Sequence, residues 1–377
     1  LGDGADSLQV NSGYYTTQIV NATLAAAWTA TSNTYNNSSY GSVNLFSAGY
    51  AVNLAATNGN YGFNVTNTAG ATSLTGSNVN DTLVGGTGND TLNGGAGNDK
   101  LFGDSGDDTI NGDIGNDNIV GGDGRDFIVD TIGANILDGG AGNDTMDGGA
   151  SGDIYIIATS ADHGVAEIQD TGTNGTDELR FSSTTANQTL TVFAGDTGLE
   201  RVVIGNGTAA SASTSGTTAL SINAAAAVNA LTITGNDGAN TLTGSALADT
   251  IIGNAGNDVI SGGAAADQIT GSAGADTLTG GAGNDLYIAP EAVVFDTGGS
   301  DTVSMLGGGV ATISASAGDL DGNPGIEAID VAGSGRLLGL TRAAVISVSD
   351  TDVLRVFGSG ADRLVFEDTG WTRGAPS

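Results

Sequence analysis

The feature that most constrains this chain is a nine-residue repeat that runs without insertion through two blocks. Its units begin at residues 76, 85, 94, 103, 112, 121, 130, 139 and 148 in the first block, and at 235, 244, 253, 262, 271 and 280 in the second. The eighth position is apolar in all fifteen units, and the sixth is Asp in thirteen, the exceptions being Asn135 and Asn240. Such regularity predicts a stack of short coils instead of one globular core.

The residue types within a unit indicate how it folds and what it binds. Glycines at the first, second and fourth positions permit positive φ and close backbone approach. The seventh to ninth positions favour a strand, so two units are expected to form one turn of a flattened coil with the eighth side chain inside. Carboxylates beside exposed carbonyls are the hard oxygen donors that Ca²⁺ prefers, and it takes about 6–8 of them.

Composition excludes several classes of function. With 42 acidic and 9 basic residues the net charge is −33, which argues against a nucleic-acid partner. The chain has no cysteine and one histidine, His163, so disulfides, thiolate metal sites and paired-histidine metal sites are ruled out. No apolar run approaches the roughly 20 residues of a transmembrane segment. Aromatic residues, at 5%, are too few for an ordinary large core, so bound cations are expected to close the structure.

The motif GGxGxDxUx, where U is apolar, resembles the RTX, or haemolysin-type, calcium-binding repeat. The resemblance covers residues 76–156 and 235–288. It implies an all-β fold, a parallel β-roll or β-solenoid, in which several Ca²⁺ ions each lie between the loop of one unit and that of the unit two later. Carried over position by position, it implies these metal ligands: Gly86, Gly88, Asp90, Gly95, Gly97, Asp99, Gly106, Asp108, Gly115, Asp117, Gly122, Gly124, Asp126, Gly140, Gly142, Asp144, Asp153, Gly256, Asp258, Asp267, Gly274, Asp276, Gly281, Gly283 and Asp285.

Some units depart from the motif. Val79 and Leu247 replace the fourth glycine, so the first unit of the first block and the second unit of the second block are expected to have poorer loops. Unit 130–138 departs most, because it loses two glycines and carries Asn135 in place of the sixth Asp. We expect the ion sites that it shares with its neighbours to be the weakest. Asp and Gly also form simple turns, but turns alone do not require this spacing.

The blocks divide the chain into five segments. Both blocks end alike, at Tyr155 and Tyr287, and the sequences that follow them are similar, with alternating apolar and polar residues that predict further strands. The two ends of the chain also resemble each other, so we expect a piece of a longer tandem array. The segments are 1–75 (strand-rich), 76–156 (block 1), 157–234 (strand-rich connection), 235–288 (block 2) and 289–377 (strand-rich).

Other patterns are weaker. Residues 103–107 read GDSGD, like the surroundings of a serine-protease nucleophile, but they lie in register with the repeat. His163 is expected to be an exposed loop residue. Within residues 319–330 the side chains that carry oxygen are spaced as in an EF-hand loop. Pro324 stands where that loop needs glycine, so a turn between strands is expected.

Two acid–arginine pairs invite an enzymatic interpretation. Glu178 with Arg180, and Glu200 with Arg201, could line a polysaccharide cleft, although we expect solvated surface pairs. No cluster of catalytic side chains can be assembled from one lysine, one histidine and scattered arginines, so the chain is not expected to be an enzyme.

We therefore expect a calcium-binding structural module. For the RTX family the resemblance implies type I secretion, an unfolded state at low cytoplasmic Ca²⁺, and folding in the extracellular space or at the cell surface. Two alternatives stay open: the β-helix part, catalytic or not, of a polysaccharide-modifying exoenzyme, and an adhesin or surface-layer module with a ligand-binding face. The expected partners are calcium ions and an unidentified cell-surface or polysaccharide ligand, with no nucleic acid and no transmembrane segment.

Overall fold

The computed structural model describes residues 9–10, 20–37, 43–172, 174–208 and 210–288, followed by seven short strands between residues 292 and 366. Every regular element in these residues is a β-strand, which confirms the all-β fold class. Within them, no helix is long and apolar enough to cross a membrane. The chain divides into two compact units, Leu1–Arg180 with Gly195–Leu199, and Phe181–Ala194 with Glu200–Ser377, and each is described by itself.

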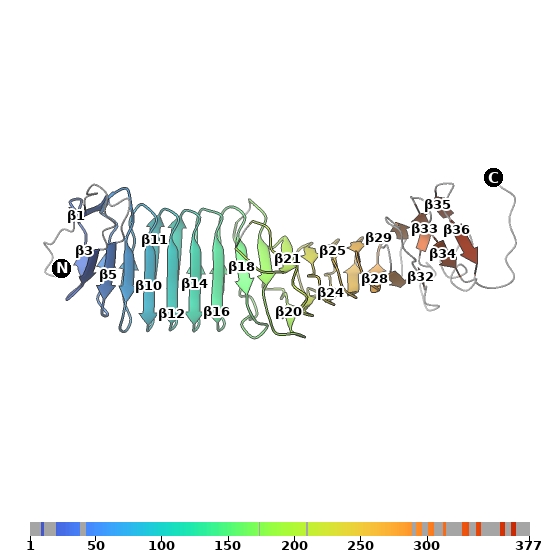
Figure 1. Cartoon of the computed structure of the whole chain (residues 1–377), viewed down its shortest axis with the longest axis horizontal. Coiled ribbons are helices and arrows are strands. Elements are labelled where there is room, and N and C mark those ends of the chain that lie inside the picture. Colours follow the sequence, from blue (N-terminus) through green and yellow to red (C-terminus); the bar gives the residue numbers. More distant parts are fainter. Residues whose placement is uncertain are drawn as a thin grey trace. The chain divides into compact units, whose positions relative to one another are not determined.

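One sheet of the first unit consists of parallel strands, each paired with the strand one turn later. In block 1 its register advances by 18 residues, as Leu83 lies opposite Leu101 and Leu101 opposite Ile119. Two nonapeptides therefore make one turn, as the sequence predicts. Its strands, stacked side by side in Figure 1, are β2 (Val20–Thr23), β5 (Val43–Ser47), β8 (Asn64–Asn67), β10 (Thr82–Thr87), β12 (Lys100–Ser105), β14 (Asn118–Asp123), β16 (Ile136–Ala141) and β18 (Ile154–Ile157).

The second sheet of this unit takes the other half of each turn. Its order is β17-β15-β13-β11-β9-β6-β3, again with parallel pairing. A third, short sheet of β1 (Gln9–Val10), β4 (Tyr35–Asn36) and β7 (Asn58–Gly59) belongs to the turns before the repeats. The strands of the second sheet are β3 (Trp28–Thr29), β6 (Val52–Asn53), β9 (Ser73–Thr75), β11 (Thr91–Ala96), β13 (Thr109–Ile114), β15 (Phe127–Val129) and β17 (Thr145–Asp147).

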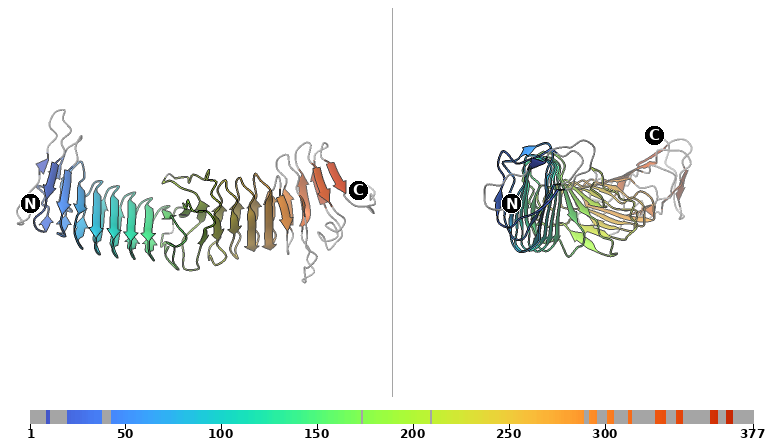
Figure 2. Two further views of the ribbon diagram at one scale, coloured as in Figure 1. Left: turned by 60° about the horizontal axis from the view of Figure 1, so that its bottom comes forward. Right: turned by 60° about the vertical axis from the view of Figure 1, so that its left-hand side comes forward.

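The second unit also has two parallel sheets, and its block 2 strands stack in the left-hand view of Figure 2. The first contains β21 (Arg201–Ile204), β23 (Thr232–Thr234), β25 (Thr250–Ile252), β27 (Gln268–Thr270), β29 (Leu286–Ile288), β31 (Asp301–Ser304), β33 (Ile326–Val331) and β35 (Arg355–Gly358). The second contains β20 (Thr189–Thr191), β22 (Ser221–Asn223), β24 (Thr241–Thr243), β26 (Val259–Ala264), β28 (Asp276–Ala282), β30 (Ala292–Phe295), β32 (Thr312–Ile313), β34 (Leu337–Leu340) and β36 (Arg363–Phe366). Strand β19 (Glu178–Phe181) crosses the division between the units.

The core of the repeats is one apolar side chain per nonapeptide. All fifteen eighth-position residues, from Leu83 to Tyr155 and from Leu242 to Tyr287, are at most 1% exposed. Their neighbours at the seventh and ninth positions point outward, because successive side chains of a strand alternate between its faces. Such a core is thin, so contacts between the loops at the edges of the coil are needed to hold adjacent turns together.

Candidate metal sites

Most loops of the repeats adopt left-handed backbone at two positions. The second and fourth positions have positive φ in most units, and several residues other than glycine share it. Ala265, for example, adopts φ 70° at a fourth position. The non-glycine residues of the repeats in this conformation are Asp104, Asp113, Ser151, Asn254, Ala265 and Ser272, and each occupies a second or fourth position. The loop shape is therefore kept after single substitutions in regular units, but it is lost at one or both positions in the units that begin at residues 76, 130, 235 and 244.

Each loop presses its glycines against carbonyl groups of the preceding turn. A Cβ atom on Gly115 would clash with the carbonyl oxygen of Gly97, and one on Gly122 would clash with that of Asp104. Only a hydrogen fits at these points, which explains the glycines of the motif. The carbonyl oxygens of one loop consequently face the next loop, where they can serve as metal ligands.

The sixth-position carboxylates form columns along both edges of block 1. The backbone N–H of Asp90 donates to Oδ1 of Asp108 over 2.7 Å, and those of Asp108 and Asp126 donate to the next Asp over 2.8 Å. The other edge repeats the pattern, with Asp81 donating to Asp99. Block 2 does the same, with Asp258, for example, donating to Asp276 over 2.9 Å. One oxygen of each carboxylate is thus committed to the neighbouring turn.

The second oxygen of many of these carboxylates has no hydrogen-bond donor beside it in the described residues. Within the part of the chain that the structure describes, it is buried and accepts no hydrogen bond in a recurrent set of sixth-position residues. Burying such an oxygen without a partner is costly, so a cation is the expected partner. The first-position glycine lies directly against it, since a Cβ atom on Gly103 would clash with Oδ2 of Asp108. The set is Asp90, Asp99, Asp108, Asp117, Asp126, Asp144, Asp153, Asp258, Asp267 and Asp276.

Electrostatics give the same indication. Burial, followed by the charges of neighbouring carboxylates, raises the pKa of Asp99 to about 7 and that of Asp108 to about 7, far above the ordinary aspartate value of about 3.9. A column of groups that resist ionisation in this way is stabilised in its charged form by a bound cation. The atoms available as metal ligands are all oxygen, as Ca²⁺ prefers, whereas Zn²⁺ typically takes nitrogen and sulfur ligands.

Comparison with known families agrees with this geometry. A family model of the RTX calcium-binding nonapeptide repeat (4 copies) matches residues 75–110, 100–128, 120–155, 234–269 and 261–289. The two blocks are RTX calcium-binding repeats. No protein with a curated description matches the chain. The expected ligands of the RTX blocks lie in the loops just described, and their coordination of Ca²⁺ remains a prediction.

The two poorer loops of the RTX blocks satisfy their own carboxylates. Ser77 donates through its hydroxyl to Oδ2 of Asp81 over 2.7 Å, and Ser245 does the same to Oδ2 of Asp249 over 2.9 Å. In both cases the serine stands at the second position, and the backbone N–H of the same serine also donates to the carboxylate. These hydrogen bonds satisfy the oxygen that has no partner in a regular loop such as that of Asp108, and the expectation that the two loops are poorer ion sites stays a prediction.

Unit 130–138 has a replacement for its missing charge. Asn135 accepts the N–H of Asp117 through Oδ1 over 2.9 Å, so it keeps the hydrogen-bonded column intact. Asp130, at the first position, brings its carboxylate to the same place as Asp117, since a Cβ atom on Gly112 would clash with the Oδ2 atoms of both. Burial and the charge of Asp117 raise the pKa of Asp130 to about 8. This second carboxylate was not predicted from the sequence.

The fifth position links adjacent turns by hydrogen bonds, a role that was not predicted from the sequence. Asn80 accepts the N–H of Asn98, and Asn98 that of Asn116, over 2.8 and 3.0 Å, on the exposed side of the loops. The same ladder runs on the other edge, where Asp107 accepts the N–H of Arg125. The recurrence of Asn before the sixth-position Asp was the available signal.

A further unit lies beyond the matched residues, at 172–180. Its sequence, GTNGTDELR, keeps two glycines, the Asp and the apolar eighth residue. Gly175 has φ 113°, Asp177 accepts the N–H of Asp153 over 2.7 Å, and Leu179 is fully buried. Asp177 therefore extends the carboxylate column by one turn, although it lies 24 residues after Asp153 instead of 18.

The expectation of an exposed His163 is wrong. Its side chain is 1% exposed, with Nδ1 3.2 Å from Glu167 Oε2 and Nε2 3.0 Å from Asp196 Oδ2. Burial alone would lower the pKa of His163, but the hydrogen bonds to Asp196 and Glu167 outweigh it and raise the pKa to about 9. The raised pKa favours the protonated form of His163, whose positive charge faces the two buried carboxylates just after block 1.

The expectation of a solvated Glu178–Arg180 pair is also wrong. Arg180 is 1% and Glu178 3% exposed, and Arg180 Nε donates to Glu178 Oε1 over 2.5 Å. Alternation along β19 fails here because both faces of this strand are covered. Glu200 is exposed, as expected. The protease-like segment 103–107 is ordinary repeat, with Ser105 opposite Asp123, and most of the EF-hand-like segment lies outside the described residues.

Proposed function

We propose that this chain is a calcium-binding structural module of a secreted or cell-surface protein, and that its repeats fold when Ca²⁺ binds outside the cell. The observation that carries the proposal is the column of buried sixth-position carboxylates, most of which have one oxygen bonded to the adjacent turn and one, as in Asp90 and Asp108, without a hydrogen-bond partner in the described residues. A cation between turns would engage that oxygen together with the carbonyl groups of the loops.

The energetics support coupling between binding and folding. Each nonapeptide buries a single apolar side chain, and most units add a buried carboxylate oxygen that accepts no hydrogen bond within the described residues. Since the ion site does not exist in the unfolded chain, the free energy of binding adds to the free energy of folding. Extracellular calcium modules bind at roughly 10⁻⁴–10⁻³ M, a range that would leave the repeats unfolded in a cytoplasm with little free calcium.

Circular dichroism of the full chain tests the proposal. In chelator we expect the β-sheet signal to be weak, and in millimolar Ca²⁺ we expect it to rise in a cooperative transition. Mg²⁺ at the same concentration is the control, and it should substitute poorly because it demands tighter octahedral coordination. A spectrum already rich in β-structure in chelator, and unchanged by Ca²⁺, would contradict the proposal.

We also propose that the chain itself has no catalytic role. The polysaccharide alternative relied partly on Arg180, which is buried against Glu178 and so is not available to a substrate. The carboxylates of the blocks are engaged in the columns. We expect no turnover of alginate, pectin or peptide substrates by the calcium-loaded chain. Turnover that disappeared on replacing Arg201, which is partly exposed, would overturn this part of the proposal.

A further inference from the structure

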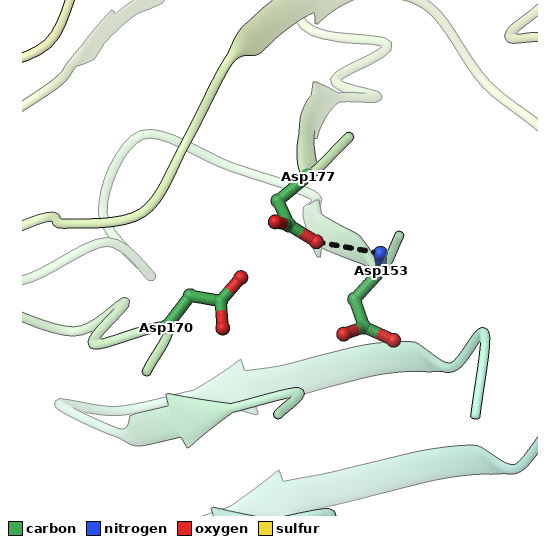
Figure 3. A group of neighbouring side chains, drawn as sticks. All are labelled: Asp153, Asp170 and Asp177. Atoms are coloured by element: carbon green, nitrogen blue, oxygen red, sulfur yellow. Dashed lines mark hydrogen bonds between the residues drawn. The ribbon is translucent and has the colours of Figure 1, made fainter. Parts of the chain in front are cut away.

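Three carboxylates meet at the end of block 1, and two of them lie outside the matched RTX repeats. Asp153, Asp170 and Asp177 are 0%, 6% and 4% exposed, and each offers an oxygen that lies within 4.8 Å of those of the other two. Figure 3 shows the three carboxyl groups arranged around one space. Three buried acids at this separation repel one another strongly unless a cation or protons compensate the charge.

A buried oxygen of this group lacks a partner. Asp153 receives the N–H of Asn135 at Oδ1 over 2.7 Å, whereas its Oδ2 accepts no hydrogen bond in the part of the chain that the structure describes. The backbone orients the other two carboxylates, with the N–H of Asp153 donating to Asp177 and that of Gly172 donating to Asp170, both over 2.7 Å. Backbone donors thus fix the positions of all three groups.

The fold explains why Asp170 arrives here. Ile168 lies opposite the eighth-position Met146, so Asp170 follows one turn after Gly148, where the motif has its first-position glycine. The first position of the repeat lies against the sixth-position carboxylate, and a Cβ atom on Gly148 would clash with Asp153. An aspartate placed at this point adds a carboxylate to the edge of the column, as Asp130 does beside Asp117.

We propose that Asp153, Asp170 and Asp177 form a Ca²⁺ site at the end of block 1, with two of its three ligands beyond the matched repeats, and that this site fastens the connecting segment 157–177 to the block. Three oxygen ligands with a combined charge of −3 suit a hard divalent cation, and Ca²⁺ tolerates the irregular geometry of a junction better than Mg²⁺ does. The site extends calcium binding beyond the matched residues and makes the order of the connecting segment depend on the same ion.

Counting bound calcium in the full chain tests the site. Asp170→Asn and Asp177→Asn each remove a charge but keep an oxygen that can accept the backbone hydrogen bond. Asp123→Asn, at an exposed third position in block 1, is the matched control. By equilibrium dialysis with radioactive calcium, we expect the first two variants to bind about one ion fewer per chain than the wild type, and the control to bind the same number.

Two outcomes of the ion count are decisive, and a third calls for a second measurement. If the wild type binds calcium and Asp170→Asn loses none, the junction holds protons instead of an ion and this inference is wrong, while the proposed function stands. If the wild type itself binds no calcium, the proposed function fails as well. If Asp170→Asn loses many ions together with its β-sheet signal, the count no longer reports on one site, and a second measurement decides.

Terbium luminescence provides that second measurement, because Tb³⁺ takes the oxygen ligands of Ca²⁺ and is excited through nearby tyrosine. Tyr155 accepts the N–H of Gly148 at its hydroxyl over 2.8 Å, and Gly148 lies against the Asp153 carboxylate. The part of the emission that is excited through Tyr155 is the part that Tyr155→Phe removes. We expect Asp170→Asn to weaken this part and Asp123→Asn to leave it unchanged. Equal emission in the two Asn variants would overturn the site.

Discussion

The backbone N–H of Asp90 donates a 2.7 Å hydrogen bond to Oδ1 of Asp108 one turn away, while Oδ2 of Asp108 is buried and accepts no hydrogen bond within the described residues. The sixth-position aspartate therefore has two separable tasks. Its Oδ1 bonds to the adjacent turn, and its Oδ2 is the atom that we propose engages a cation. An Asp→Asn change preserves the first task and removes the charge on which the second depends.

This separation predicts different results for two aspartates. Asp108→Asn should move the calcium midpoint of folding to higher concentration, by an amount that corresponds to roughly 1.5–3 kcal/mol, as for other interactions with a charged group. Asp81→Asn should move it much less, because Ser77 already satisfies Oδ2 of Asp81. Calcium titration of both variants, followed by circular dichroism, measures the difference. Equal shifts would contradict the division of tasks.

The metal-free chain should respond to acid in an unusual direction. The folded pKa of Asp99 and of Asp108 is about 7, whereas an aspartate in the unfolded chain titrates near about 3.9. Between these values the folded state holds protons that the unfolded state has released, so stability is present at low pH and is lost as pH rises through 7. We expect the chelated chain to contain more β-structure at pH 5 than at pH 8.

Calcium should reverse this dependence. Protons and Ca²⁺ compete for the same carboxylates, so the calcium midpoint should be higher at pH 5 than at pH 8. Both conditions lie above the isoelectric point of about 4.1, which limits precipitation. A chelated chain that is less ordered at pH 5 than at pH 8 would show that the columns are not protonated when metal is absent.

The repeats could be predicted from sequence because their chemistry is periodic. Leu83, Leu101 and Ile119 fall at one position of the period, and the structure stacks them in one buried row. The loop glycines could be predicted for the same reason, since a position that needs left-handed backbone or close approach selects glycine in many units at once. An apolar residue at the same position of fifteen units is difficult to reconcile with any other fold.

What the sequence could not provide was the environment of residues that occur once. His163 lies outside the repeats, and loops bring Glu167 and Asp196 to it. Arg180 contacts Glu178 of its own strand, and the pair is buried because both faces of β19 are covered. The proximity of Asp170 to Asp153 could not be predicted, because it depends on the path of an insertion that the local sequence does not determine. Long-range contacts of this kind appear only in the folded chain.

The carboxylate of Asp130 should compensate for Asn135. Replacing Asp130 by Gly restores the first-position residue of the motif but removes the charge beside Asp117, so calcium-induced folding should weaken by roughly 1.5–3 kcal/mol. Adding Asn135→Asp in that background supplies the sixth-position carboxylate and should recover the loss. Calcium titration of the single and double variants measures both steps. Failure of the double variant to recover would show that the two positions do not serve the same ion.

The buried histidine should stabilise the chain independently of calcium. His163→Gln leaves Glu167 and Asp196 without their cation, and breaking a buried pair in this way costs about 3–5 kcal/mol. Arg125→Gln is the matched control, because Arg125 is exposed and its 3.8 Å pair with Asp107 contributes little. Denaturant unfolding in saturating calcium compares the two variants with the wild type.

The same variant should show a pH dependence with a defined sign. The pKa of His163 is about 9 in the fold and near about 6.5 in an unfolded chain, so its stabilisation is complete below 6.5 and is lost as pH rises through 9. The difference in unfolding free energy between the wild type and His163→Gln should therefore shrink from pH 7 to pH 10. A difference that stayed constant would mean that the histidine is neutral in the fold.

Relief of backbone strain should stabilise block 2 at one loop. Ala265 occupies a fourth position with φ 70°, a conformation that costs a non-glycine residue about 1–2 kcal/mol. Ala265→Gly removes this cost, and the added flexibility of the unfolded chain offsets about 0.5–1 kcal/mol of it, so a net gain of up to about 1 kcal/mol is expected. Ala264→Gly is the control, since Ala264 lies in β26 with negative φ, where glycine only adds flexibility and should destabilise. Denaturant unfolding of both variants in saturating calcium gives the comparison. If both changes destabilised the protein equally, the left-handed backbone at the fourth position would carry no strain, and the recurrence of glycine there would follow only from its close approach to the carbonyl groups of the neighbouring turn.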